Sequence, residues 1–170
     1  MNKKHIILIG FMGTGKSTVS RELKNLLALP EIDTDVWIEK EEGRAIKDIF
    51  EQSGEEYFRN LETDLAMRLT EMPASIVSCG GGMVIRKENA DYLKQSGTVI
   101  WLTAKPETIL ERIKEFHTRP LLEGNMNSEY ISTLLDARMK YYQYACENIV
   151  STDGKKAKDI AIEIKKIVEK

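Results

Sequence analysis

Eight consecutive residues near the start of the chain restrict its fold more than any other feature. They read Gly-Phe-Met-Gly-Thr-Gly-Lys-Ser over positions 10–17, which fits the pattern of glycine, four residues, glycine, lysine and serine or threonine. An apolar run at His5–Ile9 precedes them, and Ser17–Leu27 carries apolar residues at helical spacing. A strand, a glycine-rich loop and a helix in this order indicate a phosphate-binding loop, and therefore a protein that binds a nucleoside triphosphate.

Each residue type in this loop has a physical task. Glycines adopt backbone conformations that other residues avoid, so successive N–H groups can converge on phosphate oxygens at the N-terminus of the helix. The Lys16 ammonium is predicted to assist catalysis by holding the β- and γ-phosphates, and the Ser17 hydroxyl is predicted to bind Mg²⁺. We expect the nucleotide to contact a continuous stretch of the loop and helix start: Gly13, Thr14, Gly15, Lys16, Ser17 and Thr18.

Short apolar runs alternate with amphipathic stretches along the rest of the chain. Candidate strands lie at His5–Ile9, Glu31–Asp33, Ser75–Cys79, Thr98–Leu102 and Asn148–Ser151. Such alternation predicts an α/β fold, with a five-stranded parallel sheet flanked by helices in one domain spanning 1–170. Two segments interrupt it, a mainly helical insertion at about 35–72 and a polar connection at about 115–127, which are typical of binding regions and lids.

Composition excludes several function classes. The 170 residues are 42% hydrophobic and 31% charged, with a net charge of −2, as in an ordinary soluble domain. Since basic and acidic residues are interspersed, we expect no nucleic-acid partner and no anionic membrane partner. No apolar run approaches the roughly 20 residues of a membrane span, and the N-terminal apolar run is too short for a signal peptide. The protein is therefore expected in the cytoplasm.

Two carboxylates follow the second candidate strand. Asp33 and Asp35 are two residues apart, and in an extended chain such residues point the same way, so both could face the γ-phosphate. One carboxylate could hold Mg²⁺ through water while the other accepts a proton from an attacking hydroxyl. Alternatively, Asp35 merely caps the next helix.

The third strand and a late helix supply further candidates. Three glycines, at 80–82, could expose N–H groups and let a ligand approach closely, or simply form a flexible turn. Arg138 continues the apolar stripe of a predicted helix at Ser128–Cys146. A guanidinium group keeps its proton, so an arginine in this core-facing position requires an anion, either a ligand or a protein carboxylate.

Two more arginines have competing interpretations. Arg59 lies at helical spacing from Glu55 and Glu62, and such a surface pair contributes little. Together with Arg138, it could instead bind an acidic, hydroxylated small molecule. Arg119 could close over a transferring phosphoryl group, or it could be a solvated charge in a loop.

These residues together resemble the shikimate kinase family over nearly the whole chain. The likeness rests on six motifs in the same order: Gly10–Ser17; Ile32-Asp33-Thr34-Asp35; Ile46–Phe50 with Gly54-Glu55, Phe58-Arg59 and Glu62; Gly80-Gly81-Gly82; Arg119-Pro120-Leu121-Leu122; and Arg138 with Tyr142. The resemblance implies a nucleoside-monophosphate-kinase-like fold with a helical substrate-binding region and a lid. It implies ATP- and Mg²⁺-dependent phosphorylation of the 3-hydroxyl of shikimate, on the route through chorismate to aromatic amino acids.

The resemblance also assigns roles to residues. Asp35 would be the catalytic base, Asp33 would support Mg²⁺ with Ser17, and Arg119 would close on the phosphates during catalysis. Arg112 would stack on adenine. The shikimate contacts would be Asp35, Arg59, Arg138 and the glycines Gly80, Gly81 and Gly82, with the two arginines holding the carboxylate. We expect a monomer.

Other functions remain as alternatives. A related kinase for gluconate or a nucleoside monophosphate would share the phosphate loop, although the pair of aspartates with the two arginines argues against it. A nucleotide-dependent switch or a silent binding module belongs to another class. A GTPase would carry an Asn/Thr-Lys-x-Asp sequence, which is absent, and a silent relative would have lost Lys16 or Asp35.

Overall fold

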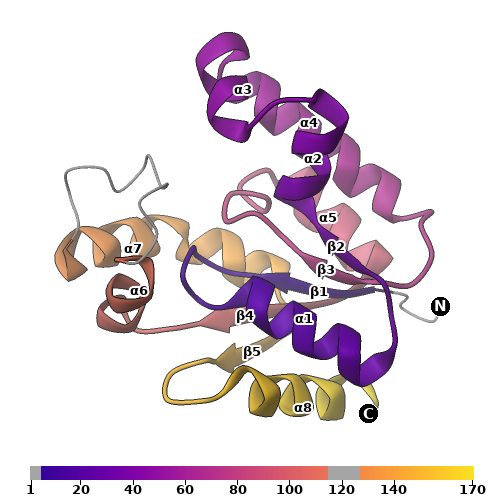
Figure 1. Cartoon of the computed structure of the whole chain (residues 1–170), viewed down its shortest axis with the longest axis vertical. Coiled ribbons are helices and arrows are strands. Elements are labelled where there is room, and N and C mark those ends of the chain that lie inside the picture. The colour runs from indigo at the N-terminus through magenta and orange to yellow at the C-terminus, as the bar shows by residue number, and fades with distance from the viewer. Residues whose placement is uncertain (1–4, 115–126) are drawn as a thin grey trace.

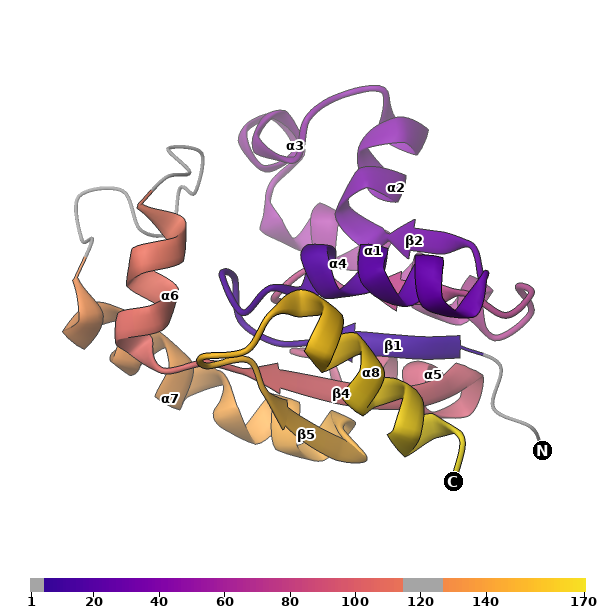
Figure 2. The same ribbon diagram turned by 60° about the horizontal axis from the view of Figure 1, so that its bottom comes forward.

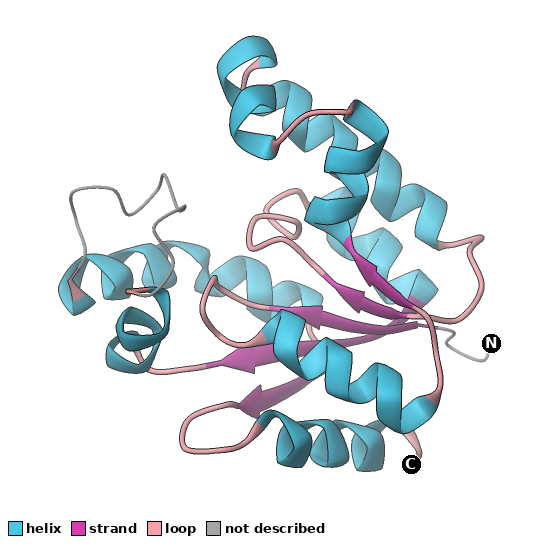
Figure 3. Ribbon diagram, in the orientation of Figure 1, coloured by secondary structure: helices cyan, strands magenta, loops and turns pink. Residues whose placement is uncertain are grey.

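A computed structural model describes residues 5–114 and 127–170, within which five strands alternate with helices. The strands are β1 (His5–Ile9), β2 (Glu31–Asp33), β3 (Ile76–Ser78), β4 (Gly97–Thr103) and β5 (Asn148–Ser151). The helices are α1 (Lys16–Leu27), α2 (Thr34–Glu42), α3 (Ile46–Ser53), α4 (Glu55–Leu69), α5 (Lys87–Ser96), α6 (Pro106–Ile113), α7 (Ser128–Ala145) and α8 (Ala157–Val168). All strand pairs are parallel, in the order β2-β3-β1-β4-β5 (Figure 3). The predicted fold class is confirmed.

The sheet is buried on both faces, which explains why β1 is apolar from Ile6 to Ile9. Side chains alternate across a strand, so Ile7 and Ile9 join one core while Ile6 and Leu8 join the other. Helices α1 and α8 cover the second face, and α4, α5 and α7 cover the first (Figure 1). A third, smaller cluster packs α6 and α7 against the loop after β1.

Strand order brings the predicted motifs to one edge of the sheet. Leu8 of β1 is in register with Ser78 of β3, and Ser78 is in register with Asp33 of β2. The loop after β1, the start of α2 and the glycines at 80–82 therefore emerge side by side. In Figure 2, α6 and the α2–α3 region project in the same direction, with the loop after β1 between them.

One local prediction is wrong. The chain is not extended from Asp33 to Asp35, because α2 already begins at Thr34. Asp33 is the N-cap, and its Oδ1 accepts hydrogen bonds from the N–H groups of Asp35 (3.0 Å) and Val36 (3.1 Å). The first N–H groups of a helix lack partners within the helix, so a carboxylate at this position is stabilising. The capping role proposed as an alternative for Asp35 thus belongs to Asp33.

The two predicted insertions have different outcomes. Helices α2, α3 and α4 occupy the first one, and α3 packs on α4 through Phe50 and Phe58, whose ring centroids are 4.9 Å apart. The predicted lid at 115–127 lies outside the described residues, except for Asn127. The Asn127 side chain caps α7 by accepting a hydrogen bond from the Tyr130 N–H at 2.7 Å. None of the helices in the described ranges is long and apolar enough to cross a bilayer.

Candidate active site

The loop between β1 and α1 is held together by its own carbonyl groups. Lys16 Nζ donates to the carbonyl oxygens of Gly10 (2.6 Å) and Phe11 (2.9 Å), and Thr14 Oγ1 also donates to Phe11 O at 2.8 Å. Gly10 cannot be replaced easily, since its φ is 147° and a Cβ atom there would lie 2.5 Å from Leu102 O. Helix α1 has no side-chain cap at Gly15, so its first N–H groups can receive an anion.

A small depression adjoins this loop. A cavity of about 190 Å³ lies between α1, α6 and the loop after β5, and it is lined by predicted nucleotide contacts: Thr14, Gly15, Thr18 and Arg112. Arg112 Nη1 donates to Gly13 O (3.1 Å) and Thr152 Oγ1 (3.0 Å), while Nη2 donates to Thr152 O (3.1 Å). Thr152 thus fixes the plane of the Arg112 guanidinium group. No sequence pattern indicated this role for Thr152.

The three glycines make room for three charged side chains. A Cβ atom at Gly80 would lie 2.5 Å from Asp35 Oδ1, and one at Gly81 would lie 3.4 Å from Arg138 Nη1. A Cβ atom at Gly82 would collide with the guanidinium group of Arg59. The glycines at 80–82 do not have positive φ angles. Glycine is therefore required here because charged side chains approach the backbone closely, and not because of the backbone conformation. The structure therefore gathers five predicted substrate contacts and Asp35 in one place.

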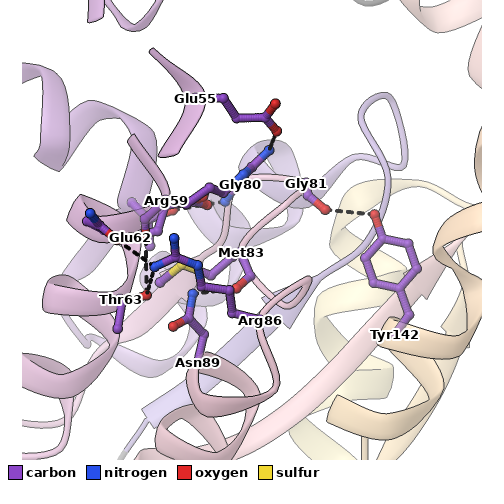
Figure 4. Close-up of polar contacts among 12 residues, drawn as sticks. Glu55, Arg59, Glu62, Thr63, Gly80, Gly81, Met83, Arg86, Asn89 and Tyr142 are labelled. Atoms are coloured by element: carbon purple, nitrogen blue, oxygen red, sulfur yellow. Dashed lines mark hydrogen bonds and ion pairs between the residues drawn. The ribbon is translucent and has the colours of Figure 1, made fainter. Parts of the chain in front are cut away.

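Hydrogen bonds fix this glycine turn from three directions, and Figure 4 shows most of them. The Gly80 N–H donates to Thr34 Oγ1 at 2.9 Å, and Tyr142 OH donates to Gly81 O at 2.8 Å. Asn89 Nδ2 donates to Met83 O at 2.9 Å. A turn anchored by α2, α5 and α7 differs from the flexible turn considered as an alternative.

Arg59 pairs with the two acids suggested by its helical spacing, but the prediction of a surface pair is wrong for one of them. Arg59 Nη2 lies 3.3 Å from Glu55 Oε1, and Arg59 Nη1 lies 2.5 Å from Glu62 Oε1 (Figure 4). The Glu62 side chain is only 1% exposed, and its Oε2 has no hydrogen-bond partner in the described structure. Burial raises the pKa of Glu62 to about 7, against the opposing effect of Arg59.

The burial of Glu62 could have been predicted. Glu62 occupies the same stripe of α4 as Phe58, Leu65 and Leu69, all of which are buried. A charged residue in an apolar stripe is the signal that singled out Arg138.

The raised pKa of Glu62 predicts a pH-dependent stability. Between the usual value of 4.5 and about 7, the folded protein keeps a proton on Glu62 that the unfolded chain has released. The free energy of unfolding should therefore fall as the pH rises through this window and level off above it, by about 3 kcal/mol for this group. Urea unfolding of wild type and Glu62→Gln at pH 5 and pH 8 measures the difference. Glu55→Gln is the control, since this exposed partner of Arg59 should leave the slope unchanged; an equal slope in Glu62→Gln contradicts the assignment.

Arg138 contrasts with Arg59. Its half-buried guanidinium group lies over the Phe11 ring, with Cζ 5.8 Å from the ring centroid, and beside Gly81. Within 5–114 and 127–170, no carboxylate forms an ion pair with Arg138. A protein carboxylate as the anion that Arg138 requires, one of the two alternatives, is thus not found in this part of the chain. The guanidinium group is left for an anionic ligand.

The two predicted magnesium ligands, Ser17 and Asp33, fit an ion that is bound by few protein groups. Ser17 is exposed at the start of α1, and the hydrogen bonds that Asp33 accepts from Asp35 and Val36 both use Oδ1, which leaves Oδ2 for a water molecule or a cation. The described residues contain no cluster of three or more His, Cys, Asp or Glu side chains suited to a metal. Mg²⁺ keeps several waters and needs few protein ligands when it binds phosphates, so this donor set suits it. Arg119 lies outside the described residues.

Comparison with known proteins decides the family. The family model described as shikimate kinase matches residues 12–169. This chain belongs to the shikimate kinase family. A shikimate kinase from Persephonella marina is 44% identical over 161 residues, which cover 95% of this chain and 96% of the relative. The structure of a shikimate kinase from Acinetobacter baumannii in complex with shikimate superposes with a TM-score of 0.91 at 34% identity, covering 98% of this chain and 93% of that one.

A solved gluconokinase structure bears on the alternative of a related kinase for gluconate. A gluconokinase from Sinorhizobium meliloti is 18% identical to this chain, with a TM-score of 0.59. At this distance the likeness extends to the fold alone. The fold is therefore shared with another kind of kinase, and the assignment to the shikimate kinase family rests on the family model and on the identity to its members.

Proposed function

We propose that this protein transfers the γ-phosphoryl group of ATP to the 3-hydroxyl of shikimate, with Mg²⁺ as the metal ion. The observation that carries the proposal is the glycine turn at 80–82, around which Asp35, Arg59 and Arg138 converge next to the phosphate loop. One carboxylate and two guanidinium groups match an acceptor that has hydroxyl groups and a carboxylate. Membership of the shikimate kinase family supports the same acceptor.

On the nucleotide side, the chain supplies positioning and positive charge. Arg112 borders the cavity proposed for the base, and the N–H groups at the start of α1 receive phosphate oxygens. Lys16 exchanges the carbonyl groups of Gly10 and Phe11 for the β- and γ-phosphates. Mg²⁺, held by Ser17 and by Asp33 through Oδ2, would neutralise charge on the phosphates. Arg119 is proposed to close on the phosphoryl group, which rests on the family resemblance.

On the acceptor side, the two arginines bind the carboxylate and Asp35 handles a proton. Arg59 is held in place by Glu62 and Glu55, so its remaining donors have a defined direction. Asp35 is held at the start of α2, against Gly80, where it accepts the proton of the attacking hydroxyl. We propose that the protein is a monomer that acts in the cytoplasm, which size-exclusion chromatography and cell fractionation test.

Release of ADP by the purified protein tests the proposed reaction. The protein is supplied with ATP and Mg²⁺ and with shikimate, gluconate, AMP or no acceptor. We expect turnover with shikimate alone, and ³¹P NMR of the product should place the phosphate on the 3-hydroxyl. ADP release without preference for an acceptor, or ATP binding without turnover, would instead favour a nucleotide-dependent switch or a silent module.

Replacing Arg138 by lysine should weaken shikimate binding selectively. Lysine keeps the charge but cannot make two parallel hydrogen bonds to a carboxylate, so we expect the Kd for shikimate to rise by about tenfold while the Kd for ATP stays constant. Calorimetric titration measures both values. Arg68→Lys is the matched control, because Arg68 pairs with Glu41 and Asp64 on the outer surface of α4. An equal loss for both ligands would indicate a folding defect instead.

A further inference from the structure

Phe11 belongs to the nucleotide loop, but its ring lies against Arg138 of the proposed acceptor site. Phe11 is only 1% exposed, and the guanidinium group of Arg138 lies over its ring at 5.8 Å. The ring face is electron-rich and attracts a cation more strongly where water is excluded. No carboxylate in the described ranges forms an ion pair with Arg138, so its orientation before a ligand arrives depends on the Phe11 ring and on the neighbouring Tyr142 hydroxyl.

The backbone of Phe11 belongs to the nucleotide site. Its carbonyl oxygen accepts hydrogen bonds from Lys16 Nζ (2.9 Å), Thr14 Oγ1 (2.8 Å) and the Thr14 N–H (3.3 Å). When Lys16 turns toward a phosphate, this carbonyl loses one of its three donors. The nucleotide therefore changes the contacts of the residue whose ring supports Arg138.

Gly81 also lies close to Arg138. A Cβ atom at Gly81 would lie 3.4 Å from Arg138 Nη1, 3.7 Å from Gly10 O and 3.8 Å from the Met12 N–H nitrogen, so the loop and the glycine turn are in contact here. Tyr142, one helical turn after Arg138 on α7, donates to Gly81 O at 2.8 Å. Arg138 thus adjoins both the Phe11 ring and an anchored backbone, so a small movement of the ring changes where the guanidinium group can lie.

We propose that Phe11 is a positioning residue for the acceptor, which orients Arg138 through its ring and couples that orientation to the nucleotide through its carbonyl group. This inference rests on the proposed function, because it takes shikimate as the ligand of Arg138. Coupling of this kind is reciprocal: if ADP changes the affinity for shikimate by a factor, shikimate changes the affinity for ADP by the same factor. The coupling should depend on the aromatic ring.

Phe11→Leu tests this proposal, because leucine keeps an apolar side chain but lacks the aromatic face. Calorimetry gives the Kd of shikimate with and without ADP and Mg²⁺, and the Kd of ADP alone, for wild type and variant. In wild type we expect the Kd of shikimate to differ between the two conditions. In Phe11→Leu we expect that Kd to rise about three- to tenfold, the coupling factor to approach one, and the Kd of ADP alone to stay within about twofold.

Ile131→Val is the matched control. Ile131 is a buried residue of α7 in the same apolar cluster as Phe11, and its truncation also reduces packing. We expect wild-type affinities and coupling in this variant, and thermal unfolding of both variants measures their packing losses.

The possible results separate this inference from the proposed function. Four results would overturn the role of Phe11 while leaving the reaction intact. Two concern the variant alone: the Kd of shikimate or the coupling factor in Phe11→Leu equals that of wild type. The other two are a coupling factor of one in wild type, and binding of ADP and of shikimate weakened equally in Phe11→Leu. Failure of the wild-type protein to bind shikimate overturns the proposed function and this inference together.

Discussion

Lys16→Ala is expected to lower kcat by at least about 10³-fold, because phosphoryl transfer depends on positioning and on charge stabilisation at the phosphates. Lys16 Nζ already lies 2.6 Å and 2.9 Å from two carbonyl oxygens of the phosphate loop, so its ammonium group is held where the phosphates are proposed to bind. Alanine removes this charge from the loop and leaves the loop carbonyls with one donor fewer. Single-turnover assays at saturating ATP and acceptor would measure the phosphoryl-transfer step directly.

Lys24→Ala provides the matched control for this experiment. Lys24 is an exposed lysine in the last turn of the same helix, α1, far along the chain from the phosphate loop. We expect wild-type kcat in this variant and comparable thermal unfolding in both. A near-normal kcat in Lys16→Ala would contradict the assignment of residues 10–17 as a catalytic phosphate loop.

Asp35→Asn is expected to reduce kcat by about 10²-fold or more, because an amide cannot accept the proton of the attacking hydroxyl. Asparagine has nearly the same shape as aspartate, so it should fit in the space that Gly80 leaves open, and substrate affinities should change less than kcat. Steady-state assays at pH 6 to 9 with both substrates varied separate these quantities.

Helix stability has to be separated from catalysis in this variant. Asp35 lies in the first turn of α2, where a negative charge favours the helix, and Asp48 lies in the first turn of α3. Asp48→Asn therefore removes a comparable charge without touching the proposed site. If Asp35→Asn and Asp48→Asn both keep the wild-type kcat, Asp35 serves only the helix.

Much of the fold was predictable because its signals are local. The strand, loop and helix around residues 10–17 are consecutive in the chain, and the alternation of apolar runs fixes a parallel α/β arrangement with few alternatives. The requirement of Arg138 for an anion also follows from one helix, since its position in the stripe with Ile131 and Tyr142 is a matter of helical spacing.

The charged site depended on contacts between distant segments. The Gly80 N–H and Thr34 Oγ1 are 46 residues apart in the chain, and Tyr142 and Gly81 are 61 residues apart. Neither helical nor strand periodicity reports such pairs, so the glycines were interpreted as a source of N–H groups rather than as space for Asp35, Arg138 and Arg59. The surface interpretation of Glu62 has another origin: its spacing to Arg59 was correct, but its place in the apolar stripe of α4, a local signal of burial, was not used.

By itself, the sequence of this protein determined the phosphate loop, the parallel α/β class and which charged residues need partners, because these depend on neighbouring residues and on chemical type. Only the tertiary structure decided that each glycine at 80–82 accommodates one charged side chain, and that Phe11 lies beneath Arg138. Those features arise where β1, β2, β3 and α7 meet, and the packing of segments from different parts of the chain sets which groups exclude water and touch.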